Sequence, residues 1–368
     1  MTEKKSIPTV SKSTIMDIVP YKPGKSTISD GRKPVKLSSN ESPFGTSDKT
    51  KLAIVEAAAN QFRYPDGGCT ILRSKLAETH NINMDNIVCG AGSDELISLI
   101  CDAYAGEGDE VLCSEYGFLM YPISAMKVGA KAVFAKETNL RTDINNIIDS
   151  ITDRTKIIFI ANPNNPTGSY ISNEEMTYLH KKIPENIILV IDSAYAEYVN
   201  KDDYDCGIKL VQSSNNVIMT RTFSKIYGLG GIRLGWAYCP DSIADVLNRV
   251  RGPFNVSNIA QNAGIAALSD VDFLQESIEH NKKWLGIMAE SLGKIGIKSY
   301  PSAANFILVE FPEEEEFNAQ NANKFLLSKN IIGREMTAYK LPKCMRFTIG
   351  TEEENKLLLK TLENFLNK

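Results

Sequence analysis

The sequence predicts an α/β protein with a mostly parallel sheet, followed by a smaller α+β unit. Two observations indicate this fold class. From about residue 50 to residue 250, short apolar runs alternate with segments of helical periodicity. The runs show no polar alternation, which is typical of parallel strands that helices cover on both faces. After about residue 255 a long helical pattern leads into fewer and more widely spaced strands.

The first part opens with a helix and continues with six strands. Leu52, Val55, Ala59 and Phe62 recur at helical spacing, and the turn residues of 64–68 end that helix. The six apolar runs are residues 87–89, 111–113, 132–134, 157–160, 187–191 and 217–219. Helical stretches separate these runs, so we expect βαβ crossovers and a parallel sheet.

The second part is interpreted as a smaller unit. Its long helix is indicated by Phe273, Ile278, Leu285, Met288 and Leu292. Strands are expected at 306–309 and 345–349, with helices at 322–327 and 358–366. The sequence therefore predicts three regions: an N-terminal arm at 1–45, a large domain at 46–255 and a small C-terminal domain at 256–368.

Composition excludes several classes of function. The 368 residues include 41 Lys and Arg and 45 Asp and Glu, and the net charge of −4 argues against nucleic-acid and membrane partners. Three distant His and no paired Cys spacing predict no metal site. No run approaches the ~20 apolar residues of a membrane span. The first eight residues lack a signal-peptide core, and seven scattered Cys suit a reduced compartment, so we expect a cytoplasmic protein.

Polar clusters follow four of the predicted strands. They occupy residues 90–95, 162–168, 192–195 and 221–225. Each has an ordinary explanation by itself: a tight turn, turn residues, a helix cap at Asp192, and a solvated lysine at Lys225. Because the carboxyl ends of parallel strands share one edge of a sheet, the four clusters together predict one binding site.

The chemistry of this site is indicated by Lys225. Hydroxyl residues, a glycine-rich stretch at 228–231 and Arg233 surround it in sequence, and Asp192 lies one strand away. Pyridoxal phosphate requires such a set: an amine for covalent attachment, a carboxylate for its ring nitrogen, and donors for its phosphate. A nicotinamide-dependent oxidoreductase is disfavoured, because Gly90-Ala91-Gly92 lacks the third glycine of the dinucleotide fingerprint.

Motifs along nearly the whole chain resemble, in the same order, those of the histidinol-phosphate aminotransferase family. They include Pro20-Tyr21-Lys22-Pro23-Gly24, Asn40-Glu41-Ser42-Pro43-Phe44-Gly45, Tyr64-Pro65-Asp66, Asn164-Asn165-Pro166-Thr167-Gly168, Arg221-Thr222-Phe223-Ser224-Lys225 and Arg346-Phe347-Thr348-Ile349-Gly350-Thr351. The resemblance implies a fold-type I pyridoxal-phosphate transferase with a seven-stranded sheet. It also implies transamination between histidinol phosphate and 2-oxoglutarate, a step of histidine biosynthesis.

The resemblance further implies roles for the matching residues. Lys225 would carry the cofactor and move the substrate proton, and Asp192 would pair with the pyridine nitrogen. Further cofactor contacts are implied for Ser93, Asp94, Phe118, Asn165, Tyr195, Thr222, Ser224 and Arg233. Tyr64 would reach the cofactor phosphate of a neighbouring subunit, which implies a homodimer with shared active sites.

Substrate binding is assigned by the same resemblance. Arg346 would grip the α-carboxylate, a planar task suited to guanidinium. Arg334, with Tyr21 from the partner's arm, would hold the substrate phosphate, although a surface salt bridge is the ordinary alternative for Arg334. Asn165 and Asn305 complete the substrate-binding set.

Other functions remain open at this point. An aromatic or broad-specificity amino-acid aminotransferase would use the same scaffold, but Arg334 would then lack a phosphate. A threonine-phosphate decarboxylase shares most of the motifs. A cofactor-binding regulator without turnover would need a DNA-binding module, for which the enzyme-like match leaves no room.

Overall fold

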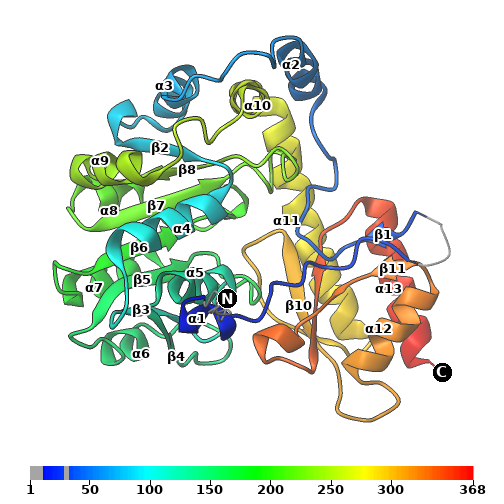
Figure 1. Cartoon of the computed structure of the whole chain (residues 1–368). Helices are drawn as coiled ribbons and strands as arrows, with labels where there is room; N and C mark the ends of the chain where they lie inside the picture. The colour runs from blue at the N-terminus through cyan, green and yellow to red at the C-terminus, as the bar shows by residue number, and fades with distance from the viewer. Residues whose placement is uncertain (1–10, 29–32, 368) are drawn as a thin grey trace, which may run out of the picture.

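The computed structural model describes residues 11–28 and 33–367. Figure 1 shows a large part built on a central sheet and a smaller part, with the long helix α11 (Val271–Lys294) running between them. Residues 1–10 and 29–32 of the expected arm lie outside the described residues, and so does the segment on which the signal-peptide prediction rests.

The central sheet has seven strands and is mostly parallel, as predicted. In spatial order they are β2 (Ile87–Gly90), β8 (Gly235–Tyr238), β7 (Val217–Thr222), β6 (Ile188–Asp192), β5 (Thr155–Ala161), β3 (Glu110–Ser114) and β4 (Lys131–Ala135). Strand β8 runs antiparallel to both of its neighbours, and the other pairs in the sheet are parallel. Six of the seven strands match the predicted runs, and β8 is the strand that the sequence pattern missed.

Helices cover both faces of this sheet. The elements of the large part are α2 (Asp48–Ala58), α3 (Thr70–His80), η1 (Met84–Asn86), α4 (Ser93–Tyr104), α5 (Met120–Val128), α6 (Ile144–Asp149), α7 (Asn173–Lys182), η2 (Ala196–Tyr198), α8 (Ile208–Gln212), α9 (Asp241–Val250) and α10 (Asn258–Leu268). Side-chain hydrogen bonds mark several helix starts. Ser172 and Glu175 form a capping box at α7, and Ser47 caps α2.

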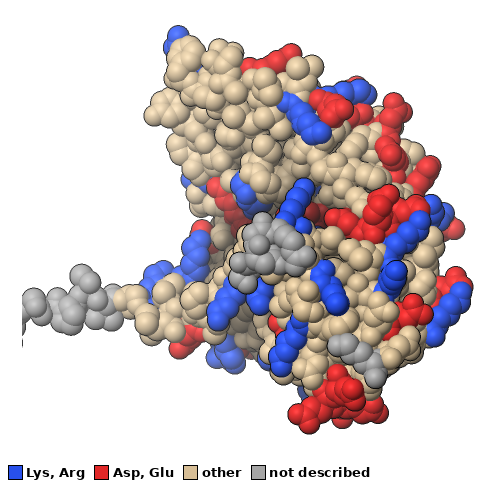
Figure 2. Space-filling view, turned by 90° about the vertical axis from the view of Figure 1, so that its right-hand side faces the viewer, with Lys and Arg blue, Asp and Glu red and all other residues tan. Residues whose placement is uncertain are grey.

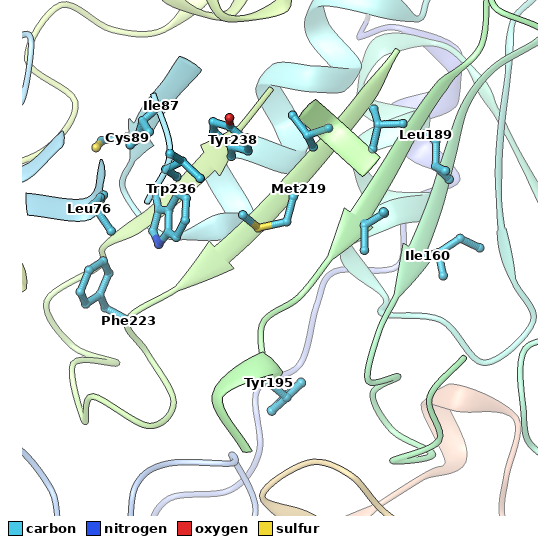
Figure 3. Packing of buried hydrophobic residues seen from close by; sticks show 14 of the residues in the cluster. Leu76, Ile87, Cys89, Ile160, Leu189, Tyr195, Met219, Phe223, Trp236 and Tyr238 are labelled. Carbon is cyan, nitrogen blue, oxygen red and sulfur yellow. The ribbon is translucent and has the colours of Figure 1, made fainter. Parts of the chain in front are cut away.

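The apolar runs lack alternation because each face of the sheet has its own core. Along β5, Ile158 and Ile160 enter one buried cluster, whereas Ile157 and Phe159 enter the other. Figure 3 shows part of the first cluster, in which Met219 and Trp236 pack on one face and Tyr195 lies beyond the strand ends. A strand buried on both faces needs apolar side chains at every position.

The smaller part is a four-stranded sheet with helices. Its strands lie in the order β12 (Arg334–Glu335), β13 (Cys344–Thr348), β10 (Phe306–Glu310) and β9 (Lys298–Ser299). The other elements are α11, α12 (Ala319–Ser328), η3 (Thr337–Tyr339) and α13 (Glu352–Leu366). Buried residues of the strands and of all three helices form a third core cluster.

The arm contacts both parts of the molecule. Strand β1 (Val35–Lys36) pairs in parallel with β11 (Ile331–Ile332), and the backbone N–H of Thr348 donates to the carbonyl of Leu37 at 2.8 Å. A short helix, α1 (Ser13–Met16), precedes this pairing and lies near α5 (Figure 1). The chain therefore crosses from the small part to the large one before α2 begins.

Helix α10 packs with the large part. Its buried residues Ala260, Ala263 and Ala267 belong to the cluster that fills one face of the seven-stranded sheet. In Figure 1 it lies beside α2 and α3. The predicted boundary at residue 255 stays a prediction, and this packing favours a boundary between α10 and α11.

The surface mixes both signs of charge. On the face shown in Figure 2, Lys and Arg side chains lie among Asp and Glu, and acidic side chains gather at one edge. Among the described residues, no helix combines the length and the apolar character that crossing a membrane requires.

Candidate active site

A cavity of about 300 Å³ lies at the carboxyl edge of the seven-stranded sheet. All four predicted polar clusters contribute to it, and the arm and the small part close it from the other side. The predicted site residues that line it are Tyr21, Ser93, Asp94, Phe118, Asn165, Asp192, Tyr195, Thr222, Ser224, Lys225, Arg233, Arg334 and Arg346. The expectation that strand ends would converge on one site is thus met.

Asp192 ends β6 and presents a buried carboxyl to the cavity. It accepts hydrogen bonds from the Tyr121 hydroxyl at 2.7 Å and from Thr220 Oγ1 at 3.1 Å. Burial raises the pKa of Asp192 to about 6, against the lowering effect of these two bonds. A cationic group in the cavity would supply the charge that stabilises this carboxylate.

Lys225 follows β7 and projects toward the same space. Its Nζ lies 5.7 Å from the centroid of the Tyr195 ring. The Tyr195 hydroxyl in turn accepts a hydrogen bond from Asn40 Nδ2 at 2.8 Å. A lysine amine and a phenol thus stand close to each other at the cavity wall.

The start of α4 forms an anion-binding corner. Gly92, at φ 89°, caps this helix, and a side chain there would collide with the guanidinium of Arg233. Arg233 reaches Asp94 Oδ2 at 3.2 Å and Ser224 Oγ at 3.4 Å. Helix N–H groups, hydroxyls and a guanidinium together favour a phosphate.

Two arginines face the cavity from adjacent strands. Arg346 on β13 pairs in register with Arg334 on β12. Arg346 donates to Asn165 Oδ1 and, at 3.0 Å, to the carbonyl of Ser38, and burial lowers its pKa. Its Nε is buried and has no hydrogen-bond partner among the described residues. These guanidinium groups are suited to an anionic ligand.

One predicted arm residue lines the cavity, and two other predicted positions stand outside it. Tyr21 lines the cavity in the single chain, and the carbonyl of the neighbouring Lys22 accepts a hydrogen bond from Arg334 Nη2 at 2.7 Å. That Tyr21 serves the site of a partner stays a prediction. Asn305 is buried outside the lining and donates to the carbonyl of Asn40 at 3.0 Å. Tyr64 is 82% exposed, away from this cavity.

Sequence reasoning missed four contributors. Tyr121 and Thr220 bind Asp192, Asn40 binds Tyr195, and Tyr339 lines the cavity beside the two arginines. Of these four, only Asn40 carried a signal in the sequence, because it stands in one of the matched motifs. In the structure it adopts a left-handed φ of 55°, which asparagine tolerates.

These residues fit pyridoxal phosphate. The buried Asp192 carboxyl, with its raised pKa, suits a protonated ring nitrogen, and the Gly92–Arg233 corner suits a phosphate. Lys225 places in the cavity an amine of the kind that attaches this cofactor. The fold and this site define a fold-type I aminotransferase dependent on pyridoxal phosphate.

Comparisons with known proteins identify the family. The model of the aminotransferase class I and II family matches residues 32–362. Histidinol-phosphate aminotransferases of Maricaulis maris and Paramagnetospirillum magneticum are 47% and 49% identical, over 96% of this chain and 98% and 97% of their own lengths. The solved histidinol-phosphate aminotransferase from Sinorhizobium meliloti, in complex with pyridoxal-5'-phosphate, has a TM-score of 0.85 at 27% identity, covering 99% of this chain and 96% of its own. The chain belongs to the histidinol-phosphate aminotransferase family, within the class I and II aminotransferases.

Proposed function

We propose that this aminotransferase moves the amino group of histidinol phosphate to 2-oxoglutarate, giving imidazole-acetol phosphate and glutamate in histidine biosynthesis. The observation that carries the proposal is the pair Arg334 and Arg346 at one cavity. Histidinol phosphate has a phosphate ester where an amino acid has its carboxylate, and glutamate has two carboxylates. The two guanidinium groups would bind the phosphate of histidinol phosphate in one half of the reaction and the two carboxylates of glutamate in the other.

The roles assigned to the cofactor-binding residues are part of this proposal. Asp192 would hold the ring nitrogen, and Asn165 and Tyr195 the phenolic oxygen, while Phe118 would stack on the ring. Ser93, Asp94, Thr222, Ser224 and Arg233 would surround the phosphate. Once bound, pyridoxal phosphate supplies an electron sink that makes the substrate's Cα–H bond acidic.

Lys225 would act on the substrate proton. Its amine lies in the cavity beside Tyr195. There it would take the proton from the Cα of the substrate as a general base and give the proton back as a general acid. Asp192 would stay ionised throughout, and Arg334 and Arg346 would hold the substrate so that its Cα–H faces Lys225.

The substrate is tested by comparing amino donors. Purified holoenzyme is mixed with histidinol phosphate, phenylalanine, tyrosine or threonine phosphate, and the cofactor absorbance is followed by stopped flow. We expect histidinol phosphate to react with the highest efficiency, and threonine phosphate to release no carbon dioxide. Faster reaction with the aromatic amino acids would favour the broad-specificity alternative, and carbon dioxide release would favour the decarboxylase.

We also propose that the active unit is a homodimer with shared sites. Exposed apolar side chains support this, because such patches mark interaction surfaces. The Tyr64 ring stacks on Phe254 with centroids 4.7 Å apart. Around this pair, on α2, α3 and the adjoining loops, lie the exposed Leu52, Val55, Phe62 and Ile71. A symmetric partner on this face would bring Tyr64 to the neighbouring cofactor phosphate.

Subunit complementation tests the shared site. We expect Lys225→Ala subunits to be inactive alone and Tyr64→Ala subunits to be impaired, and the two are unfolded and refolded together to form mixed dimers. If Tyr64 serves the partner's site, each mixed dimer regains one intact site, and the equimolar mixture recovers about a quarter of wild-type activity. No recovery in dimers verified by light scattering would place Tyr64 in its own chain's site or outside catalysis.

We propose a cytoplasmic location for this enzyme. Its cysteines are free thiols, and all but Cys206 are buried. Such use of cysteine as a small core residue suits a reducing compartment. Fractionation of the native host, with immunodetection of the protein, would test the location.

A further inference from the structure

Glu137 carries a buried carboxyl oxygen that none of the roles above uses. It stands two residues after β4, and its Oε2 is buried without a hydrogen-bond partner among the described residues. Burial, with a smaller contribution from the like charge of Glu115, raises the pKa of Glu137 to about 7. Such a carboxyl lowers the stability of the fold, which points to a role beyond packing.

The other oxygen of Glu137 joins two loops. Its Oε1 accepts hydrogen bonds from Ser114 Oγ, at the end of β3, and from Asn164 Nδ2 at 3.3 Å, in the turn after β5. Two donors from two separate loops therefore converge on one oxygen of this side chain.

Each of these loops carries a residue of the cavity. Phe118 follows Ser114 by four positions, and Asn165 is the neighbour of Asn164. Asn165 Oδ1 also accepts a hydrogen bond from Arg346. Glu137 itself does not line the cavity. It stands behind two residues that do.

We propose that Glu137 is a positioning residue, which fixes Phe118 and Asn165 relative to each other by accepting hydrogen bonds from both loops. The proposal rests on the cofactor-binding roles proposed above for those two residues. The titratable groups that face Glu137 are Glu115, Tyr116 and Cys113. The hydroxyl of Thr142 supports the network by donating to Ser114 Oγ at 3.3 Å.

The test compares Glu137→Ala with Glu137→Gln in the holoenzyme. The readouts are the visible circular dichroism of the bound cofactor and kcat/KM. We expect Glu137→Ala to alter the dichroism and to lower kcat/KM about ten- to a hundred-fold, as for a lost buried acceptor. Glu137→Gln should keep both near wild type, because its amide oxygen can accept the same bonds. Glu107→Ala, at an exposed glutamate before β3, is the matched control and should change neither.

Thermal unfolding against pH supplies a readout independent of turnover. The folded-state pKa of Glu137 lies above its ordinary value of 4.5, so ionisation costs stability once the pH exceeds that ordinary value. Between pH 4.5 and about 7 the Tm of wild type should therefore fall relative to that of Glu137→Gln, and the difference should stay level at higher pH. If Glu137→Ala does not fold, Ser114→Ala, which removes one donor, should give a smaller change of dichroism and kcat/KM in the same direction.

The outcomes distinguish a failure of the role of Glu137 from a failure of the cofactor contacts assigned to Phe118 and Asn165. Wild-type dichroism and kcat/KM in Glu137→Ala, or in Ser114→Ala where the first variant does not fold, would overturn the positioning role. So would a Glu137→Gln variant as impaired as Glu137→Ala. If Phe118→Ala and Asn165→Ala alter the dichroism while Glu137→Ala does not, only the role of Glu137 fails. If neither of those two variants alters it, the assigned cofactor contacts fail, and this inference fails with them.

Discussion

The hydroxyl of Tyr121 donates a hydrogen bond to Oδ2 of Asp192 at 2.7 Å, deep in the large part. Tyr121 is fully buried in α5 and stacks on Phe159 with ring centroids 4.6 Å apart. Burial and the charge of Asp192 both raise the pKa of Tyr121, so its phenol stays protonated and donating. A core tyrosine thus fixes the orientation of the carboxylate that is proposed to meet the cofactor ring.

Tyr121→Phe should weaken cofactor binding in a pH-dependent way. The Tyr121 bond lowers the pKa of Asp192, so its loss should raise that pKa above about 6. In the proposed site the cofactor ring pairs with an ionised Asp192. As the pH is lowered, cofactor affinity should therefore begin to fall at a higher pH in the variant than in wild type. Fluorescence titration of the apoenzyme with pyridoxal phosphate from pH 5.5 to 8.5 measures this shift.

Two control variants accompany Tyr121→Phe: one removes the second donor to Asp192, and the other changes a tyrosine that does not line the cavity. Thr220→Val removes the weaker 3.1 Å bond to Asp192 and should shift the profile in the same direction by less. Tyr178→Phe, at an exposed tyrosine of α7, should leave it unchanged. Superimposable profiles for Tyr121→Phe and wild type would show that Asp192 does not depend on this bond.

Lys225 is predicted to hold the cofactor covalently. Borohydride reduction of the holoenzyme, followed by peptide mapping, should find the pyridoxyl group on Lys225. Lys225→Ala should lose nearly all transamination while keeping the wild-type Tm, because this side chain lines the cavity and is not part of the core. Lys136→Ala, at an exposed lysine, should behave as wild type. A label on any other lysine would refute the assignment.

Much of the fold was predictable, because burial on both faces leaves a plain signature. Six strands were found from apolar runs, and their polar ends predicted the site because parallel strands share a carboxyl edge. Strand β8 was missed for a physical reason. It has four residues and starts with Gly235, whose Cα approaches the backbone of Ser93 too closely for a side chain. A glycine at the start of so short an apolar run predicts a turn rather than a strand.

Contacts between distant segments were not predictable. Tyr121 reads as an ordinary core aromatic, and nothing near it in sequence indicates a partner 71 residues later. The arm shows the same limit. Tyr21 lies at the cavity beside a contact between Arg334 and the carbonyl of Lys22, two residues that are 312 positions apart.

Glu197→Ala should strongly destabilise the protein. Glu197 accepts from Arg221 at 2.7 Å, and both side chains are buried, with 8% and 6% exposed. Removing the carboxylate leaves a buried guanidinium without its counter-charge, which costs about 3–5 kcal/mol. Urea unfolding of the holoenzyme measures the change. The exposed pair of Asp245 and Arg249, at 2.8 Å, is the control, and Asp245→Ala should cost under about 1 kcal/mol. Equal losses would mean that Arg221 is solvated when Glu197 is removed.

Arg334 is predicted to distinguish phosphorylated from unphosphorylated donors. A guanidinium–phosphate contact is charge-assisted, and its loss costs about 1.5–3 kcal/mol, or roughly ten- to a hundred-fold in kcat/KM. Arg334→Ala should therefore lower kcat/KM for histidinol phosphate by that factor and leave histidinol and phenylalanine, if they react, nearly unchanged. Arg334→Lys should recover only part of the loss, because an ammonium lacks the planar fork.

Arg346→Ala supplies the comparison that decides this prediction. Arg346 is buried deeper than Arg334 and contacts Asn165. It would hold the acidic group nearest to the reacting carbon in histidinol phosphate, glutamate and phenylalanine. Its loss should impair histidinol phosphate, glutamate and phenylalanine alike, so the ratio of their kcat/KM values should stay near that of wild type. Arg334→Ala should change the ratio between phosphorylated and unphosphorylated donors instead. If both variants lower all donors by one factor, Arg334 does not recognise the phosphate, and the aromatic-aminotransferase alternative gains support.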